Sequence, residues 1–137
     1  MVADVVKRLK ADVKQTTEAI GSHTKTVLVV DDEANIRRLL RQELETEGYS
    51  VEEAKDGVAA LEKVKKNKPD LVITDVMMPR LDGFDLAAVL KNNLETADIP
   101  TIILSIVEDK DRGMRLGVDR YLTNHIEEGS LLSSVET

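Results

Sequence analysis

Cysteine is absent from this chain of 137 residues, and aromatic residues are scarce. Without cysteine the chain can form neither a disulfide scaffold nor a thiolate metal site, which is compatible with a reducing cytoplasm. Because only 2% of the residues are aromatic, the core must be built almost entirely from the aliphatic side chains among its 42% hydrophobic residues. That is sufficient for one domain with, at most, a short appendage.

Long hydrophobic runs and an excess of basic residues are lacking too. The longest apolar runs are far too short to cross a bilayer, and the N-terminus lacks the apolar stretch of a signal peptide. A nucleic-acid-binding surface requires a basic patch, and none stands out in a chain whose formal net charge is −7. We therefore expect a soluble cytoplasmic protein that binds proteins and phosphorylated groups, and neither nucleic acid nor membranes.

What the sequence contains is a regular alternation of short apolar runs and amphipathic stretches. The pattern predicts strands over residues 25–30, 50–54, 71–74, 101–104 and 120–123. It predicts helices over residues 33–47, 58–66, 84–92, 109–116 and 127–135. Closely spaced β–α repeats favour parallel strands with right-handed crossovers and helices on both faces. The expected fold class is α/β, an open, doubly wound, five-stranded parallel sheet of order 2-1-3-4-5, as in flavodoxin-like folds.

Residues 1–24 precede this pattern and are expected to form an N-terminal amphipathic helix and linker, apart from a domain over residues 25–137. Their apolar side chains recur at alternating three- and four-residue steps, and Gly21 and Ser22 then end the stretch. The residues of this seam are Val6, Leu9, Val13, Thr16 and Ile20. Two interpretations stay open: a helix that rests on the domain or frays, or a coiled-coil or partner helix.

Acidic residues follow two of the predicted strands at the point where each ends. Asp31 and Asp32 come directly after the first strand, and Asp75 follows the third. In the order 2-1-3-4-5 these two strands are neighbours, so the carboxylates meet at the sheet edge where such folds bind ligands. The fourth strand brings Ser105 to the same edge. Converging carboxylates repel one another and favour a hard cation such as Mg²⁺, which indicates phosphoryl chemistry.

The expected ligands of that ion are oxygen atoms, because Mg²⁺ prefers them in octahedral geometry. Asp32 and Asp75 would each give one carboxylate oxygen, and the backbone carbonyl of Met77 would give a third. Asp31 would act through a bound water or orient the others. A carboxylate beside the ion can attack a phosphoryl group and form an acyl phosphate.

The acidic pair, the D-x-M-M-P-x-x-D-G stretch at 75–83 and Ser105 come at intervals that resemble a two-component response-regulator receiver domain. The resemblance covers residues 25 to about 137. It implies that Asp75 accepts a phosphoryl group from the histidine of a sensor kinase or a phosphotransfer protein, and that Asp31 and Asp32 hold Mg²⁺. It implies a signalling module rather than an enzyme, apart from possible self-dephosphorylation.

The same resemblance implies a conformational switch. Ser105 would swing toward the phosphoryl group, and Tyr121 would turn inward when it does. Together they would move the face that runs from the strand 101–104 to the helix 127–135, where a downstream protein binds. That face and the N-terminal helical seam are both candidates for a homodimer contact.

One departure from the family pattern concerns the fifth strand. The family usually places Lys-Pro there, whereas this chain has Asn124-His125. Asn124 donates a hydrogen bond but no charge, and charge-assisted hydrogen bonds are about twice as strong as neutral ones. We expect phosphorylation to persist with weaker coupling to the output face. The alternative is a degenerate receiver that acts as a constitutive protein-interaction module.

An unrelated class of aspartate-nucleophile enzyme fits the sequence poorly. Phosphatases of the haloacid-dehalogenase-like class carry D-x-D after the first strand, whereas Asp31, Asp32 and Glu33 are contiguous here. A chain of this length also has no room for the cap domain of that class.

Overall fold

Five short parallel strands form one sheet in the order β2-β1-β3-β4-β5, which confirms the predicted fold class. The computed structural model describes residues 2–18, 24–105 and 109–123. The strands are β1 (Thr26–Val30), β2 (Ser50–Ala54), β3 (Leu71–Thr74), β4 (Thr101–Leu104) and β5 (Arg120–Leu122). The helices are α1 (Val2–Thr17), α2 (Ala34–Thr46), α3 (Gly57–Lys66), α4 (Gly83–Lys91) and α5 (Lys110–Arg115). The helix predicted over residues 127–135 lies outside the described residues.

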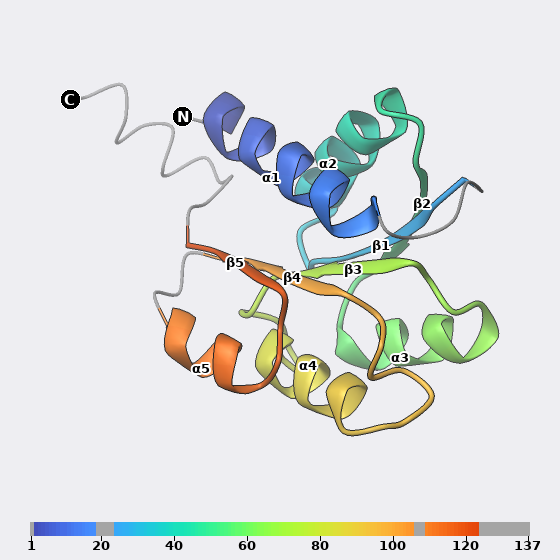
Figure 1. Cartoon of the computed structure of the whole chain (residues 1–137), viewed down its shortest axis with the longest axis vertical. Coiled ribbons are helices and arrows are strands. Elements are labelled where there is room, and N and C mark those ends of the chain that lie inside the picture. Colours follow the sequence, from blue (N-terminus) through green and yellow to red (C-terminus); the bar gives the residue numbers. More distant parts are fainter. Residues whose placement is uncertain (1, 19–23, 106–108, 124–137) are drawn as a thin grey trace.

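The helices cover the sheet on both faces (Figure 1). Helices α1 and α2 lie on one face, and α3, α4 and α5 lie on the other. Successive strand residues point to opposite faces, so Val27 and Val29 pack beneath α1 and α2 while Leu28 and Val30 pack toward α3 and α4. A strand that is buried on both faces must be apolar at every position, which explains the continuous aliphatic runs in the sequence.

Two helices begin with an aspartate that caps the first turn. The carboxylate of Asp56 accepts a hydrogen bond from the backbone N–H of Ala59 at 2.8 Å, and Asp82 accepts one from Asp85 at 2.8 Å. Such caps contribute about 1 kcal/mol each. The cap at Asp82 fixes the start of α4 close to the end of β3, where the acidic residues lie.

Helix α1 is part of the helical layer that covers one face of the sheet, together with α2. Val5, Leu9 and Val13 are fully buried in the same core as α2 and the sheet. Val6 is buried as well, and Thr17 rather than the expected Thr16 continues the buried stripe. The remaining seam residue, Ile20, lies outside the described residues.

Polar contacts attach α1 at two further places. The Lys10 ammonium lies 2.7 Å from the Glu43 carboxylate of α2, and Arg120 of β5 donates to the side-chain oxygen of Gln15 at 3.1 Å. Of the two interpretations of the N-terminal seam, the structure therefore favours a helix that rests on the domain.

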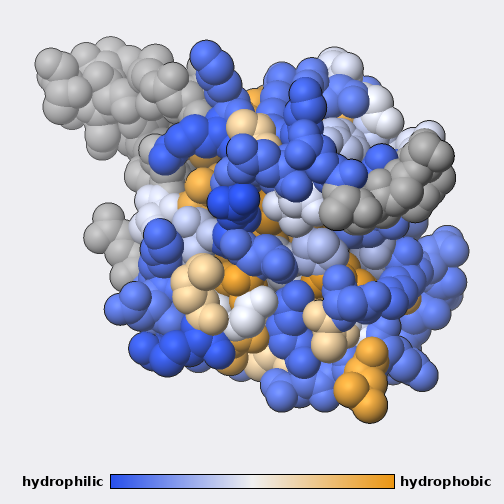
Figure 2. All heavy atoms as spheres, in the orientation of Figure 1, coloured by the Kyte–Doolittle hydropathy of each residue, from blue (hydrophilic) through white to orange (hydrophobic). Residues whose placement is uncertain are grey.

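The surface seen in Figure 2 is mostly hydrophilic, and the apolar atoms visible there are scattered over several elements. Four large apolar side chains are well exposed among the described residues: Met77, Val89, Leu94 and Met114. Within the described part of the chain, no helix combines the length and apolarity needed to cross a membrane.

Candidate functional site

Three carboxylates meet where β1 and β3 end side by side. Val30 pairs with Thr74 as the last residue of each strand, so the residues that follow emerge level with one another. The backbone N–H of Asp75 continues this pairing with a 3.0 Å hydrogen bond to the carbonyl of Val30. Asp31, Asp32 and Asp75 each offer an oxygen, and these oxygens all lie within 4.8 Å of one another.

Asp31 is held by its backbone and by its side chain. Its N–H donates to the carbonyl of Ala54 in β2 at 3.1 Å, which extends the β1–β2 pairing by one residue. Its Oδ1 accepts the backbone N–H of Glu33 at 2.9 Å, which shapes the turn into α2. The residue is buried, whereas Asp32 is exposed. The cluster thus has a fixed inner carboxylate and an outer one in contact with solvent.

Asp75 is positioned by hydrogen bonds from three sides. Its Oδ1 accepts the backbone N–H of Val76 at 2.7 Å, and the N–H of Met77 and the hydroxyl of Ser105 also donate to this carboxylate. Ser105 follows β4 directly, is buried, and is itself fixed by a 3.0 Å hydrogen bond from its N–H to the carbonyl of Leu122. The strand order therefore brings the Ser105 hydroxyl to Asp75.

Three carboxylates concentrate negative charge at this site. Burial raises the pKa of Asp31 to about 7, the hydrogen bond from Glu33 opposes this, and the charges of Asp75 and Asp32 add to it. Burial also raises the pKa of Asp75, against the hydrogen bonds from Ser105 and from the backbone of Val76 and Met77. Among the described residues, no lysine or arginine forms an ion pair with the three carboxylates.

This donor set fits a divalent cation. Three carboxylate oxygens at one point supply the hard ligands that Mg²⁺ prefers, and the exposed side of Asp32 leaves room for the waters that Mg²⁺ retains. An ion there would also stabilise the ionised form of the buried Asp31. The Asp triad is thus able to hold a metal ion.

Gly83, at the start of α4, lies directly against the backbone of Asp75 and Val76. The N–H of Gly83 donates to the carbonyl of Val76 at 3.0 Å, and a β-carbon on this glycine would overlap the carbonyl of Asp75. The turn also contains Arg80, whose φ of 71° is uncommon for a residue with a side chain. The Asp82-Gly83 pair therefore brings the start of α4 into contact with the residue that follows β3.

Tyr121 lies in β5, the strand next to β4, which Ser105 follows. Its ring is buried and stacks on Phe84 with 6.2 Å between ring centroids, and its hydroxyl accepts the backbone N–H of Asp109 at 3.4 Å. Burial raises the pKa of this phenol, and the charges of Asp109 and Asp75 add to the effect. A β-carbon on Gly113 of α5 would come within 2.6 Å of the Tyr121 ring. Tyr121 therefore links β5 to α4 and α5.

The structure brings together four of the residues that the sequence indicated: Asp31, Asp32, Asp75 and Ser105. Tyr121 is buried farther along the sheet edge, and the side chain of Met77 is exposed. Asn124 and His125 lie outside the described residues. The sequence interpretation missed Arg37, whose guanidinium contacts the backbone of Asp31. No signal in the sequence sets Arg37 apart, because it lies among the charged residues of an amphipathic helix, where most side chains are solvated.

Comparison with known proteins gives a consistent result. The family model described as "Response regulator receiver domain" matches residues 27–136. The gliding motility regulatory protein of Myxococcus xanthus is 43% identical over 124 residues, which cover 88% of this chain and 16% of that protein. The chain also spans less than half the length of the mycobacterial response regulators that it matches.

Solved structures agree with the sequence matches. The chemotaxis protein CheY4 of Vibrio cholerae superposes with a TM-score of 0.71 and 31% identity, over 83% of this chain and 98% of that one. The response regulator Rcp1 in a Mn²⁺-bound form superposes with a TM-score of 0.69 and 26% identity, over 82% of this chain and 89% of that one.

Proposed function

The chain belongs to the response regulator receiver family, and we propose that it accepts a phosphoryl group on Asp75 from a phosphohistidine. The donor is a sensor histidine kinase or a phosphotransfer protein. The observation that carries the proposal is the convergence of Asp31, Asp32 and Asp75 within 4.8 Å, with the Ser105 hydroxyl on the same carboxylate.

In the proposed transfer an oxygen of Asp75 forms a bond to phosphorus while the bond between phosphorus and the imidazole nitrogen breaks. The electron pair of that bond stays with the imidazole, which leaves as the neutral base after taking up a proton. The hydrogen bonds from Val76 and Ser105 orient the Asp75 carboxylate before attack. We propose Asp31, Asp32 and Asp75, with the backbone carbonyl of Met77, as the residues that hold Mg²⁺. When bound, this ion neutralises charge on the transferred phosphoryl oxygens, and the Mn²⁺-bound form of a structural relative supports such a site.

The proposed response begins at Ser105. Its hydroxyl donates to the Asp75 carboxylate, and the phosphoryl oxygens would become its stronger acceptor. Movement at the end of β4 reaches Tyr121, which packs between α4 and α5. The downstream protein would bind the face expected to run from β4 to the helix predicted over residues 127–135. Of this face the structure describes β4, α5 and β5, where Met114 is exposed. A second copy of the chain is a further candidate for that face.

Asn124 sets the expected strength of this response. The family's lysine would add one positive charge to a site that holds two aspartates, a dianionic phosphoryl group and one divalent cation. Asn124 adds none, so we propose that phosphorylation is coupled more weakly to the output face. The degenerate receiver, which binds its partner without phosphorylation, is the alternative.

The test is incubation with Mg²⁺ and acetyl phosphate, followed by intact-mass measurement. We expect the mass to increase by one phosphoryl group, Asp75→Asn to abolish the increase, and Asp98→Asn, which changes an exposed aspartate paired with Lys68, to retain it. A parallel titration with beryllofluoride reports the response through amide shifts. Asn124→Lys should enlarge those shifts.

Three outcomes count against parts of the proposal. An unchanged mass, together with no Mg²⁺ binding at millimolar concentration, would favour the degenerate receiver. A mass increase that survives in Asp75→Asn would move the acceptor to another residue. Identical phosphorylation and identical shifts in Asn124→Lys would remove the role given to Asn124.

A further inference from the structure

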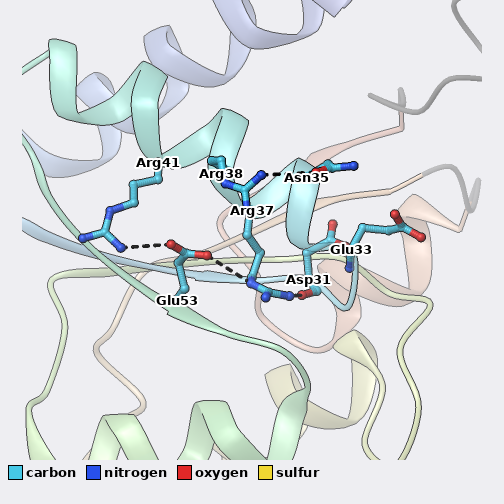
Figure 3. Close-up of polar contacts among 7 residues, drawn as sticks. All are labelled: Asp31, Glu33, Asn35, Arg37, Arg38, Arg41 and Glu53. Atoms are coloured by element: carbon cyan, nitrogen blue, oxygen red, sulfur yellow. Dashed lines mark hydrogen bonds and ion pairs between the residues drawn. The ribbon is translucent and has the colours of Figure 1, made fainter.

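Arg37 of α2 contacts the backbone carbonyl of Asp31, the first residue of the acidic cluster (Figure 3). Its Nη1 donates to the carbonyl oxygen of Asp31 at 2.6 Å, and its Nε donates to the Glu53 carboxylate at 3.1 Å. Among the described residues it forms no ion pair with Asp31, Asp32 or Asp75. We infer that Arg37 is a positioning residue for the acidic cluster, acting through the Asp31 carbonyl. This inference rests on the proposed Mg²⁺ site.

The carbonyl of Asp31 lies where the sheet no longer supplies a partner. Val30 is the last residue of β1 in the pairing with both β2 and β3, and its carbonyl accepts the N–H of Asp75. One residue later, the N–H of Asp31 still bonds to Ala54 of β2. Arg37 supplies the donor for the Asp31 carbonyl, so the peptide groups on both sides of this residue are fixed.

The two donors of Arg37 connect separate elements. Glu53 lies in β2 and pairs in register with Val29 of β1, so its carboxylate is attached to the rigid sheet. Arg41, one turn farther along α2, donates to the other oxygen of Glu53 at 2.9 Å. The guanidinium of Arg37 thereby joins α2, β2 and the end of β1. The Arg37 side chain is only 17% exposed, so solvent screens its contacts less than those of a fully exposed arginine.

Fixing this peptide matters because it sets the direction of two carboxylates. The side chain of Asp31 leaves the backbone between the two held peptide groups, and Asp32 begins at the carbonyl that Arg37 binds. Partners that orient metal ligands from outside typically contribute about 10- to 100-fold to metal affinity. A contact with the main chain acts indirectly, so we expect an effect of about tenfold, the low end of that range.

Isothermal titration with MgCl₂ on the full chain tests the inference. Arg37→Met keeps much of the apolar stem and should raise the Kd for Mg²⁺ by about tenfold. Arg37→Lys, which can still reach the carbonyl with a single donor, should recover part of the affinity. Arg41→Met is the matched control, since it removes the second arginine on Glu53 while leaving the Asp31 carbonyl bound. It should bind Mg²⁺ within about twofold of the wild type.

A stability control separates positioning from general weakening of the fold. Val64→Ala truncates a buried side chain of α3 on the opposite face of the sheet, far from the Arg37 contacts. With all variants folded by circular dichroism at the titration temperature, Val64→Ala should retain wild-type affinity. Wild-type affinity in Arg37→Met, or an equal loss in Arg41→Met or Val64→Ala, would overturn the inference. A wild-type chain that fails to bind Mg²⁺ would instead overturn the proposed function.

Discussion

Gly83 begins helix α4 directly against the carbonyl oxygen of Asp75, leaving no room for a β-carbon between them. The residue that starts a helix thus fixes the backbone of the proposed acceptor. This contact joins the packing of α4 to the chemistry of the site, and it makes Gly83 a point where a minimal change in volume should have a measurable effect.

Gly83→Ala should lower the free energy of unfolding by about 2 kcal/mol and reduce phosphorylation by acetyl phosphate, because the new methyl group displaces the Asp75 backbone. Urea unfolding and intact-mass measurement report the two effects. Gly48→Ala is the control: its φ of 93° carries strain of about 1 kcal/mol, but nothing lies within 4 Å of the added carbon. Equal phosphorylation in the two variants would contradict the expected displacement.

Gly113→Ala should destabilise the protein although alanine is the better helix former. An exposed helical glycine changed to alanine gains about 1 kcal/mol, whereas here the added carbon lies 2.6 Å from the Tyr121 ring. Removing the ring should reverse the sign, so Gly113→Ala should stabilise a Tyr121→Ala background. Urea unfolding of the four proteins in this cycle gives the answer, and stabilisation in both backgrounds would show that the ring moves aside freely.

The stability of the metal-free protein should decrease as pH rises from 5 to 8. The pKa of Asp31 is raised to about 7, so the folded state holds its proton at pH values where the unfolded state has already lost it. The stability that this group contributes is fully present only below the pKa of the unfolded state. It falls as pH rises toward 7, by about 2 kcal/mol between pH 5 and 8, and changes little above that. Asp31→Asn in EDTA should flatten the profile, as followed by urea unfolding at several pH values. Parallel profiles for the two proteins would exclude Asp31 as the cause.

Leu9→Ala should cost about 3 kcal/mol of unfolding free energy, as expected for a leucine that is 1% exposed in a shared core. Thermal and urea unfolding should show one cooperative transition that shifts as a whole. Lys7→Ala, an exposed change in the same helix, is the control and should leave the midpoint nearly unchanged. An unshifted midpoint for Leu9→Ala would mean that α1 does not share the core in solution.

Much of the fold is predictable because its strands are buried on both faces. Continuous aliphatic runs such as 27–30 and 71–74 have few other interpretations when acidic residues and helical stretches follow them. The same regularity predicts the meeting of Asp31 and Asp75, since adjacent parallel strands end at one edge. The predicted boundaries of α2, α3, α4 and α5 agree with the structure to within one residue.

What could not be predicted depends on tertiary contacts that the sequence pattern does not specify. The periodic seam of α1 does not indicate which surface it packs against. Only the structure shows that Val5 belongs to the core shared with the sheet. Gly113 indicates from sequence only a weak stretch of helix, whereas its lack of a side chain accommodates Tyr121. From sequence, Arg37 resembles a solvated charge because nothing in the helical pattern indicates that it binds the backbone carbonyl of Asp31, before the helix begins.

The packing of α1 bears on how fragments of this protein behave. The family match begins at residue 27, so a fragment cut there would lack the whole of α1. The cut would remove Val5, Leu9 and Val13 from the core that they share with the sheet. Aliphatic surface that becomes exposed to solvent in this way promotes self-association. Aggregation of such a fragment in vitro would reflect the loss of α1 rather than a tendency of the intact chain to self-associate.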